Sequence, residues 1–210
     1  MPKIYIAEVL VLSKTKLGES DLILTLLTSD NSQIRAVAKG ARKPGAKLCG
    51  ITESFTVFTG KFHSGKNLDI LTEAKTIESY SDVRDNYDKI LAGYVALELA
   101  AQVSNDGDII PRLYEMMRAY LLVLSNAEDT QQQLLLTAFL LKLNALIGYS
   151  PEYELCERNP RLAVLLRTPF ADVSGLADQH TISDLRTTMN FTQKHLPANL
   201  RALSVYRKSL

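Results

Sequence analysis

The sequence Ile-Arg-Ala-Val-Ala-Lys-Gly-Ala-Arg-Lys-Pro-Gly-Ala-Lys, residues 34–47, joins an alternating pattern to a loop rich in positive charge. Small and apolar residues alternate up to Lys39, and the alternation puts Arg35 and Lys39 on the same side, which is typical of a half-buried strand. Gly40 permits a tight turn, and Pro44-Gly45 is a turn signal. The stretch therefore predicts a β-strand that ends in an exposed basic loop.

Positive charge is concentrated around this loop although the whole chain has a formal net charge of only +1. Residues 31–66 contain seven Lys or Arg and one acid. Residues 1–80 carry 11 basic and 8 acidic groups, residues 81–160 carry 6 and 12, and residues 161–210 carry 7 and 3. The asymmetry favours a polyanionic ligand at the basic parts, whereas an ordinary solvated loop is the alternative.

The composition predicts a cytoplasmic protein. Cys49 and Cys156 are too few for a disulfide framework, and the N-terminus has no export signal. The longest apolar segment, residues 134–147, contains polar residues and is too short to cross about 30 Å of hydrocarbon.

Five short strands are expected in the first part of the chain. Asn31 suits a left-handed turn between the second and third strands, and Ser13–Asp21 is expected to be a loop. A longer connection separates the third and fourth strands, as in an OB-fold, a small barrel that binds oligonucleotides. The expected strands are Ile4–Leu12, Leu22–Thr28, Ile34–Lys39, Phe55–Phe62 and Leu68–Ile77.

From Asp82 onward the apolar residues follow a helical period. The predicted fold is therefore α+β: a five-stranded OB-fold barrel in residues 1–80, followed by an α-helical domain in residues 81–210. Residues 157–174 are expected to be irregular. The expected helices start at Ser81-Asp82, near Ile110 with Pro111 in the first turn, at a Thr130 cap, at a Thr181 and Asp184 capping box, and at Pro197; the expected breaks are Gly107 and Gly148.

Five short motifs, taken together and in order, resemble the RecO family of bacterial recombination mediators. The resemblance covers roughly residues 4–156 and is weaker beyond them. The motifs are residues 17–21, 34–43 and 50–55 in the barrel, and residues 93–99 and 148–156 in the helical part.

This resemblance implies a DNA-repair accessory protein that is not an enzyme. Such proteins bind single- and double-stranded DNA, anneal complementary strands and engage the acidic C-terminal tail of the single-stranded DNA-binding protein. With RecR they help to load the RecA recombinase, and they act in the bacterial cytoplasm at the nucleoid. The residues themselves contain three histidines and no nucleophile-elbow or phosphate-loop motif, which also disfavours an enzyme. A protein-interaction adaptor that does not bind DNA is the alternative.

The sequence departs from the family at a zinc site. Many members carry two Cys-x-x-Cys pairs, and structural zinc needs four ligands. Here Asn159 stands where a second cysteine would follow Cys156, and the region of the second pair offers only His180. We expect a degenerate zinc-finger-like region at about residues 156–180, with no zinc and no other cofactor.

The expected DNA contact is phosphate neutralisation with little sequence reading. Phe55, Phe58 and Phe62 are interpreted as barrel packing rather than as platforms for base stacking. The expected DNA-binding residues are Lys14, Lys16, Arg35, Lys39, Arg42, Lys43, Lys47, Lys61 and Lys66.

A docking site for the acidic tail of the single-stranded DNA-binding protein would need cations in the helical part. Arg118 and Lys142 are the candidates, with ordinary solvated charges as the alternative. The C-terminal cations either extend the DNA surface or simply solvate helices. They are Arg186, Lys194, Arg201, Arg207 and Lys208.

Overall fold

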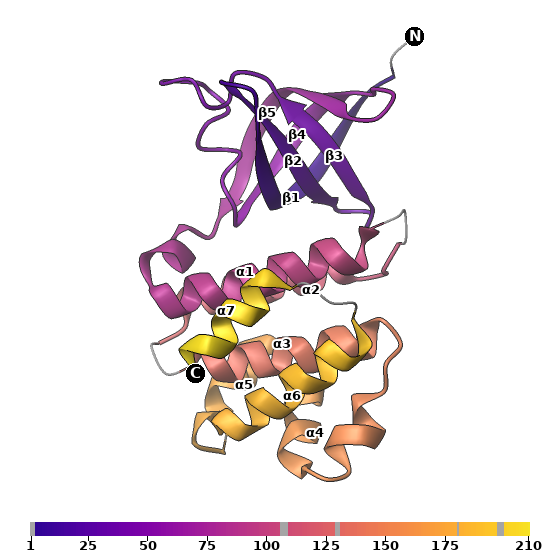
Figure 1. The fold of residues 1–210 in the computed structure, drawn as a ribbon, viewed down its shortest axis with the longest axis vertical. Helices are drawn as coiled ribbons and strands as arrows, with labels where there is room; N and C mark the ends of the chain where they lie inside the picture. Colours follow the sequence, from indigo (N-terminus) through magenta and orange to yellow (C-terminus); the bar gives the residue numbers. More distant parts are fainter. Residues whose placement is uncertain (1–2, 106–108, 129–130, 180, 197–199) are drawn as a thin grey trace. The chain divides into compact units, whose positions relative to one another are not determined.

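The computed structural model describes residues 3–105, 109–128, 131–179, 181–196 and 200–210 (Figure 1). The chain forms two compact units. The first comprises Met1–Ser81 and Ala100–Glu115, and the second comprises Asp82–Leu99 and Met116–Leu210.

The first unit is built around a closed barrel with the strand order β1-β2-β3-β5-β4, so the predicted OB-fold barrel is confirmed. All strand pairs are antiparallel except β3 and β5, which run parallel. The strands are β1 (Ile4–Leu17), β2 (Asp21–Thr28), β3 (Gln33–Ala38), β4 (Thr56–His63) and β5 (Asp69–Ser79).

Strand β1 is longer than the sequence indicated. Its first half pairs with β4, and its second half pairs with β2 as far as Leu17, opposite Asp21. The prediction that Ser13–Asp21 is a loop is therefore wrong for Ser13–Leu17 and for Asp21, the first residue of β2. A β-bulge between Val11 and Ser13 interrupts the alternation, which hides the continuity of the strand.

The barrel interior is filled by inward side chains from all five strands. Leu24, Leu26, Phe58 and Phe62 are fully buried there. At the turn between β2 and β3, Asn31 has a φ of 67°, which confirms its predicted left-handed conformation. The Asn31 side chain also accepts a hydrogen bond from the Tyr114 backbone N–H at 2.8 Å, which ties residues 113–115 to the barrel unit.

Helices form the rest of the chain, and the predicted helical domain is confirmed. The long buried helix α3 packs against α4, α5 and α6 in the second unit. No helix among the described residues is both long and apolar enough to span a membrane. The helices are η1 (Ser81–Asp85), α1 (Tyr87–Val103), α2 (Leu113–Asn126), α3 (Gln132–Leu146), η3 (Glu152–Cys156), α4 (Pro160–Arg167), α5 (Phe170–Val173), η4 (Ser174–Gln179), α6 (Ile182–His195) and α7 (Arg201–Ser209).

Two predicted helix boundaries need correction. Helical structure begins at Ser81 as predicted, but as the short 3-10 helix η1, and α1 begins after Asn86, whose side chain caps it by accepting from the N–H groups of Asp88 and Lys89. Pro111 precedes α2 rather than lying in its first turn.

Two further parts of the helical prediction have different outcomes. The stretch 157–174 contains α4 and α5, so it is not irregular. The Thr181 and Asp184 capping box of α6 is confirmed. Gly107, Thr130 and the segment 197–199, on which other boundaries were predicted, lie outside the described residues.

Candidate nucleic-acid interface

Strand β3 presents cations on its outer side. Ala36 and Ala38 are fully buried in the barrel, whereas Arg35 is exposed, as is Lys39 immediately after the strand. This is the alternation predicted from the sequence. Arg35 and Lys39 therefore share the outer side of the barrel.

The connection from β3 to β4, residues 39–55, is anchored to the barrel by buried side chains. Ala41 is only 1% exposed and belongs to the barrel core, and Leu48 and Ile51 pack against the same core. The Thr52 hydroxyl donates to the carbonyl of Leu48 at 2.9 Å. The basic residues between these anchors are thereby held in place.

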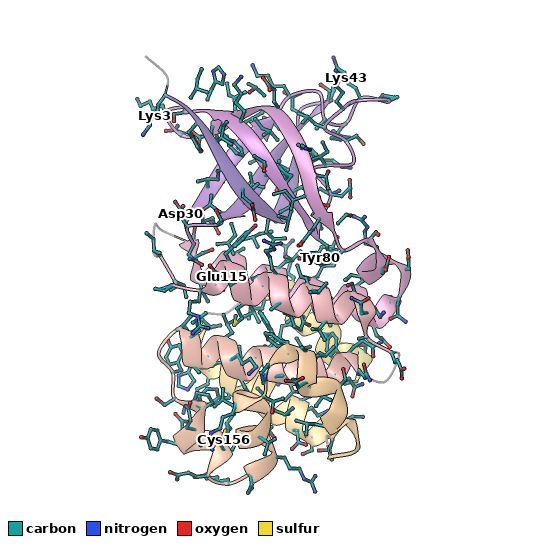
Figure 2. The ribbon with its side chains drawn as sticks, turned by 180° about the vertical axis from the view of Figure 1, so that it is seen from behind. Lys3, Asp30, Lys43, Tyr80, Glu115 and Cys156 are labelled. Atoms are coloured by element: carbon teal, nitrogen blue, oxygen red, sulfur yellow. The ribbon has the colours of Figure 1, made fainter. Side chains whose placement is uncertain are left out.

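Three successive turns carry these basic residues. Backbone hydrogen bonds close the turns 40–43, 43–46 and 46–49. We define the basic face as Arg35, Lys39, Arg42, Lys43 and Lys47, all of which are exposed. Figure 2 shows Lys43 at the edge of the barrel, across from Lys3.

The ammonium groups of Lys39, Lys43 and Lys47 donate no hydrogen bond to a carboxylate within the part of the chain that the structure describes. An ammonium group in this position keeps its capacity to bind an external anion. Arg42 differs, because its guanidinium donates to the carbonyls of Gly18 and Glu19 in the turn between β1 and β2.

Asp21, at the start of β2, lies beside the basic face. Its carboxylate accepts a hydrogen bond from the Gly40 N–H at 2.7 Å and another from the Ser20 hydroxyl at 3.1 Å. The Gly40 N–H, the Ser20 hydroxyl and the charges of Lys39 and Lys43 lower the pKa of Asp21 below its ordinary value, which outweighs the opposing effect of desolvation. Asp21 is therefore an anion that accepts one hydrogen bond from the loop and lies near two of its positive charges.

Two of the predicted DNA-binding lysines are engaged by carboxylates of the protein. Lys14, on the extended β1, pairs with Glu53, and Lys61 pairs with Glu73 at 2.9 Å. Lys16 is exposed near the end of β1, close in sequence to the 18–20 turn that contacts Arg42.

Lys66 is exposed in the connection between β4 and β5. Because Asp69 at the start of β5 pairs with Ala36, this connection adjoins β3. In OB-folds the outer side of strands 2 and 3, between the loop that follows strand 1 and the loop that follows strand 4, binds oligonucleotides. Lys16 and Lys66 therefore flank the surface on which the basic face lies.

The three phenylalanines of the barrel unit are not available for base stacking. Phe55, Phe58 and Phe62 are all fully buried, and Phe62 stacks on Tyr5 with ring centroids 5.3 Å apart. The interpretation of these rings as packing residues is confirmed. The interface therefore offers charge rather than aromatic platforms.

The two candidate tail-binding cations lie in the second unit. Lys142 is half-buried in α3, donates to the carbonyl of Leu166 at 2.6 Å and lies 5.5 Å from the centre of the Phe170 ring. Burial lowers the pKa of Lys142. Arg118 is half-buried in α2. Lys142 thus has a packing role inside the helical unit, whatever else it does.

In the region of the expected degenerate zinc finger, Cys156 is buried and Asn159 caps a helix. Cys156 is 7% exposed, and burial is the main cause that raises the pKa of its thiol. Asn159 caps α4 by accepting from the Arg161 N–H, and its amide donates to Asp184 at 2.6 Å. No three His, Cys, Asp or Glu side chains gather as metal ligands in the described part of the chain, and His180 lies outside it.

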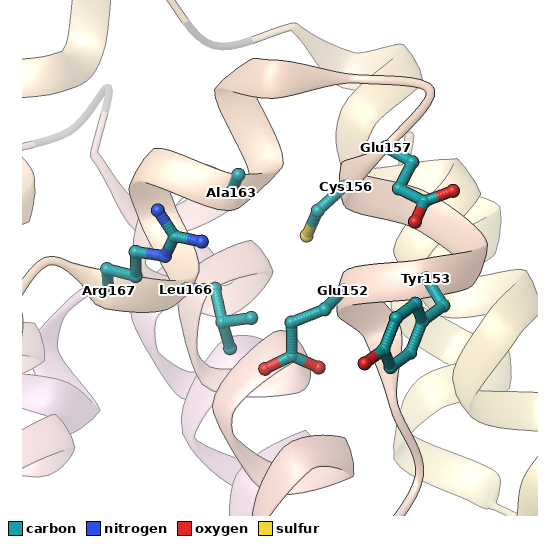
Figure 3. Close-up of a pocket in the computed structure, with 7 residues that line it drawn as sticks. All are labelled: Glu152, Tyr153, Cys156, Glu157, Ala163, Leu166 and Arg167. Carbon is teal, nitrogen blue, oxygen red and sulfur yellow. The ribbon is translucent and has the colours of Figure 1, made fainter.

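A cavity of about 390 Å³ lies beside Cys156, between η3 and α4. Figure 3 shows the sulfur of Cys156 directed toward the side of the cavity formed by Ala163 and Leu166, with Tyr153 and Arg167 on opposite walls. In the described part of the chain, one sulfur, the carboxylates of Glu152 and Glu157 and no imidazole line the cavity, and these groups do not gather as metal ligands.

A closed five-stranded barrel whose outer side and longest loop carry exposed cations defines an OB-fold protein. Comparison with known proteins gives the family. Residues 1–80 match the family description "Recombination protein O N terminal", and residues 84–161 match "Recombination protein O C terminal". The chain belongs to the RecO family of DNA repair proteins, which confirms the resemblance noted in its motifs.

A relative from Gloeobacter violaceus, described as DNA repair protein RecO, is 32% identical to the chain over 154 residues. The match covers 73% of this chain and 59% of the relative, so the chain spans less than two thirds of the length of that relative.

Proposed function

We propose that the chain binds the sugar-phosphate backbone of single- and double-stranded DNA through the basic face. The observation that carries this proposal is the set of exposed lysines, Lys39, Lys43 and Lys47. An anchored loop holds them outward, and their ammonium groups donate no hydrogen bond to a carboxylate among the described residues. Each phosphate that a lysine neutralises releases counterions, so the affinity falls as salt rises. Because contacts to phosphates carry no sequence information, sequence preference is weak.

Strand annealing follows from the same chemistry. Two complementary strands repel each other through their phosphates, and a protein surface that neutralises part of this charge lowers the barrier to their pairing. The basic face supports this step without a nucleotide cofactor or a catalytic group. The chain then acts as an accessory protein and not as an enzyme.

Membership in the RecO family supports a wider role in recombination. In this role the chain works with RecR to help RecA load on DNA that is coated by the single-stranded DNA-binding protein, whose acidic tail docks near Arg118 or Lys142. The work takes place in the bacterial cytoplasm, at the nucleoid. Co-purification with RecR and binding of a labelled tail peptide test these two partners separately.

The test of DNA binding removes two positive charges from the loop. Fluorescence anisotropy with a labelled single-stranded oligonucleotide compares the wild type with the variant Lys39→Ala/Lys43→Ala at low salt. Lys75→Glu is the matched control, since Lys75 is an exposed lysine on β5 of the same barrel. We expect a loss of binding in the double variant and nearly wild-type binding in the control.

The alternative is an adaptor whose barrel does not bind DNA. In that case the wild type gives no anisotropy change at low salt, and the double variant behaves like the wild type. Equal losses in the double variant and in Lys75→Glu would indicate a general charge effect and would also contradict the proposed site.

A further inference from the structure

We propose that Asp21 and Arg42 are positioning residues that clasp the β3–β4 loop to the turn between β1 and β2, and that this clasp directs Lys39 and Lys43 toward DNA. The proposal rests on the proposed function for its ligand. The clasp itself is a property of the fold and is testable without DNA.

The first half of the clasp runs from the start of β2 to the loop. The Asp21 carboxylate accepts the Gly40 N–H at 2.7 Å. Gly40 has a φ of 65°, in the left-handed region that glycine adopts readily. Because Gly40 lies between Lys39 and the buried Ala41, the bond to Asp21 fixes the direction in which the chain leaves β3.

The second half runs in the opposite direction, from the loop to the turn. The Arg42 guanidinium donates to the carbonyls of Gly18 at 3.2 Å and Glu19 at 2.9 Å, and the Arg42 backbone N–H donates to the Ser20 carbonyl at 2.9 Å. A lysine at position 42 would keep the charge but would lose the forked geometry with which a guanidinium reaches two carbonyls. Arg42 thus acts on DNA chiefly through the loop that it holds.

The clasp fixes the positions of Lys39 and Lys43. In the sequence, Lys39 directly precedes Gly40, and Lys43 directly follows Arg42. Lys43 folds back over Gly40, such that a methyl group at Gly40 would lie 3.7 Å from Cδ of Lys43. The turn 40–43 is closed by the hydrogen bond from the Lys43 N–H to the Gly40 carbonyl at 3.0 Å. Movement of Gly40 away from Asp21 would therefore displace both Lys39 and Lys43.

A carboxylate beside a phosphate-binding surface has two opposite effects, which makes the proposal testable. As a negative charge, Asp21 repels DNA, so simple electrostatics predicts tighter binding when it is removed. As part of the clasp, it positions the lysines, so its removal weakens binding. Glu19 is a matched control, because it is an exposed carboxylate of the same turn whose side chain makes no hydrogen bond among the described residues.

Anisotropy titrations with a single-stranded oligonucleotide compare Asp21→Ala, Glu19→Ala and Arg42→Lys with the wild type. We expect Glu19→Ala to bind DNA slightly more tightly than the wild type. Asp21→Ala should bind DNA about fivefold more weakly, which is the affinity ratio expected when the net free energy of one ordinary hydrogen bond is lost. Arg42→Lys also binds more weakly although it keeps its charge. If Asp21→Ala binds more tightly, as Glu19→Ala does, the clasp has no positioning role.

Limited digestion with trypsin tests the clasp without DNA. Loop cleavage after Lys39, Arg42 or Lys47 should be faster in Asp21→Ala than in wild type, while Glu19→Ala is cleaved at the wild-type rate. Circular dichroism shows whether each variant stays folded. If the wild type binds no DNA, the proposed function fails while digestion still decides the clasp; equal cleavage rates in all variants overturn the clasp alone.

Discussion

Lys61 on β4 and Glu73 on β5 are directly opposite each other in the antiparallel ladder, and their charged groups lie 2.9 Å apart. Lys14 forms an ion pair with Glu53, which lies in the connection between β3 and β4. An exposed pair of this kind adds only about 0–1 kcal/mol to stability. It does, however, cancel locally the positive charge that a phosphate would meet. The structure thus separates the cations predicted from the sequence into engaged and available groups.

The first prediction compares an engaged lysine with an available one. Lys43→Ala should reduce the slope of log affinity against log salt for single-stranded DNA by about 0.7, because one phosphate contact is lost. Lys61→Ala should leave the slope unchanged, since Glu73 already neutralises that ammonium group. Titrations at several salt concentrations measure both slopes, and equal reductions would show that pairing with Glu73 does not remove Lys61 from the interface.

The second prediction concerns pH. The Gly40 N–H, the Ser20 hydroxyl and the charges of Lys39 and Lys43 lower the pKa of Asp21 below 3.8, so the carboxylate stays ionised in the folded protein when it would begin to protonate in the unfolded chain. The stabilising contribution of the clasp is therefore present at neutral pH and is lost as the pH falls through the lowered pKa. The amide proton resonance of Gly40, followed by NMR, should titrate with a midpoint below 3.8. A midpoint at or above that value would contradict the bond between Asp21 and Gly40.

The third prediction tests the barrel core. Gly60 lies between Phe58 and Phe62 on the inward side of β4, and a methyl group there would lie 2.7 Å from the ring of Phe62 and 2.9 Å from that of Phe58. Gly60→Ala should lower the free energy of unfolding by about 1–3 kcal/mol, as overpacking does. Gly50→Ala is the control, because a methyl group at Gly50 meets no atom within 4 Å. Urea unfolding curves that are equal for the two variants would contradict the packing described for this strand.

The fourth prediction concerns the region around Cys156. We expect the purified chain to contain no stoichiometric zinc and to keep its melting temperature in the presence of a chelator. Asn159→Ala should instead lower the free energy of unfolding by about 1–2 kcal/mol, because it removes the cap of α4 and the bond to Asp184. Gln193→Ala, an exposed change on α6, serves as the control. Equimolar zinc with a chelator-sensitive melting temperature would show that the family's metal site persists here.

The strands of the barrel were largely predictable because each one alternates or carries β-branched residues between turn residues. The exception is β1, where Val9, Leu10, Val11 and Leu12 are all buried. A bulge next to this run shifts the register, and the sequence pattern does not reveal it. Residues 157–174 were expected to be irregular for a different reason, because the start signal of α4 was not recognised. Asn159 followed by Pro160 is that signal, with Asn159 as the N-cap and the proline at the start of the helix.

The cations of the basic face were predictable as a cluster in the sequence, but their roles were not. The pairing of Lys61 with Glu73 depends on the register of β4 and β5, which only the folded barrel defines. The contact between Asp21 and Gly40 likewise joins residues 19 positions apart. Asp21 itself was expected only to end the loop that begins at Ser13.

Lysine footprinting is the most direct measurement of where DNA binds. The chain is acetylated briefly with and without a single-stranded oligonucleotide, and mass spectrometry gives the modification of each lysine. Our account predicts that DNA protects Lys39, Lys43 and Lys47, while Lys75 and Lys208 react as in the free protein. Protection confined to lysines outside the barrel, or no protection under conditions where DNA is bound, would contradict the proposal that the basic face binds the DNA backbone.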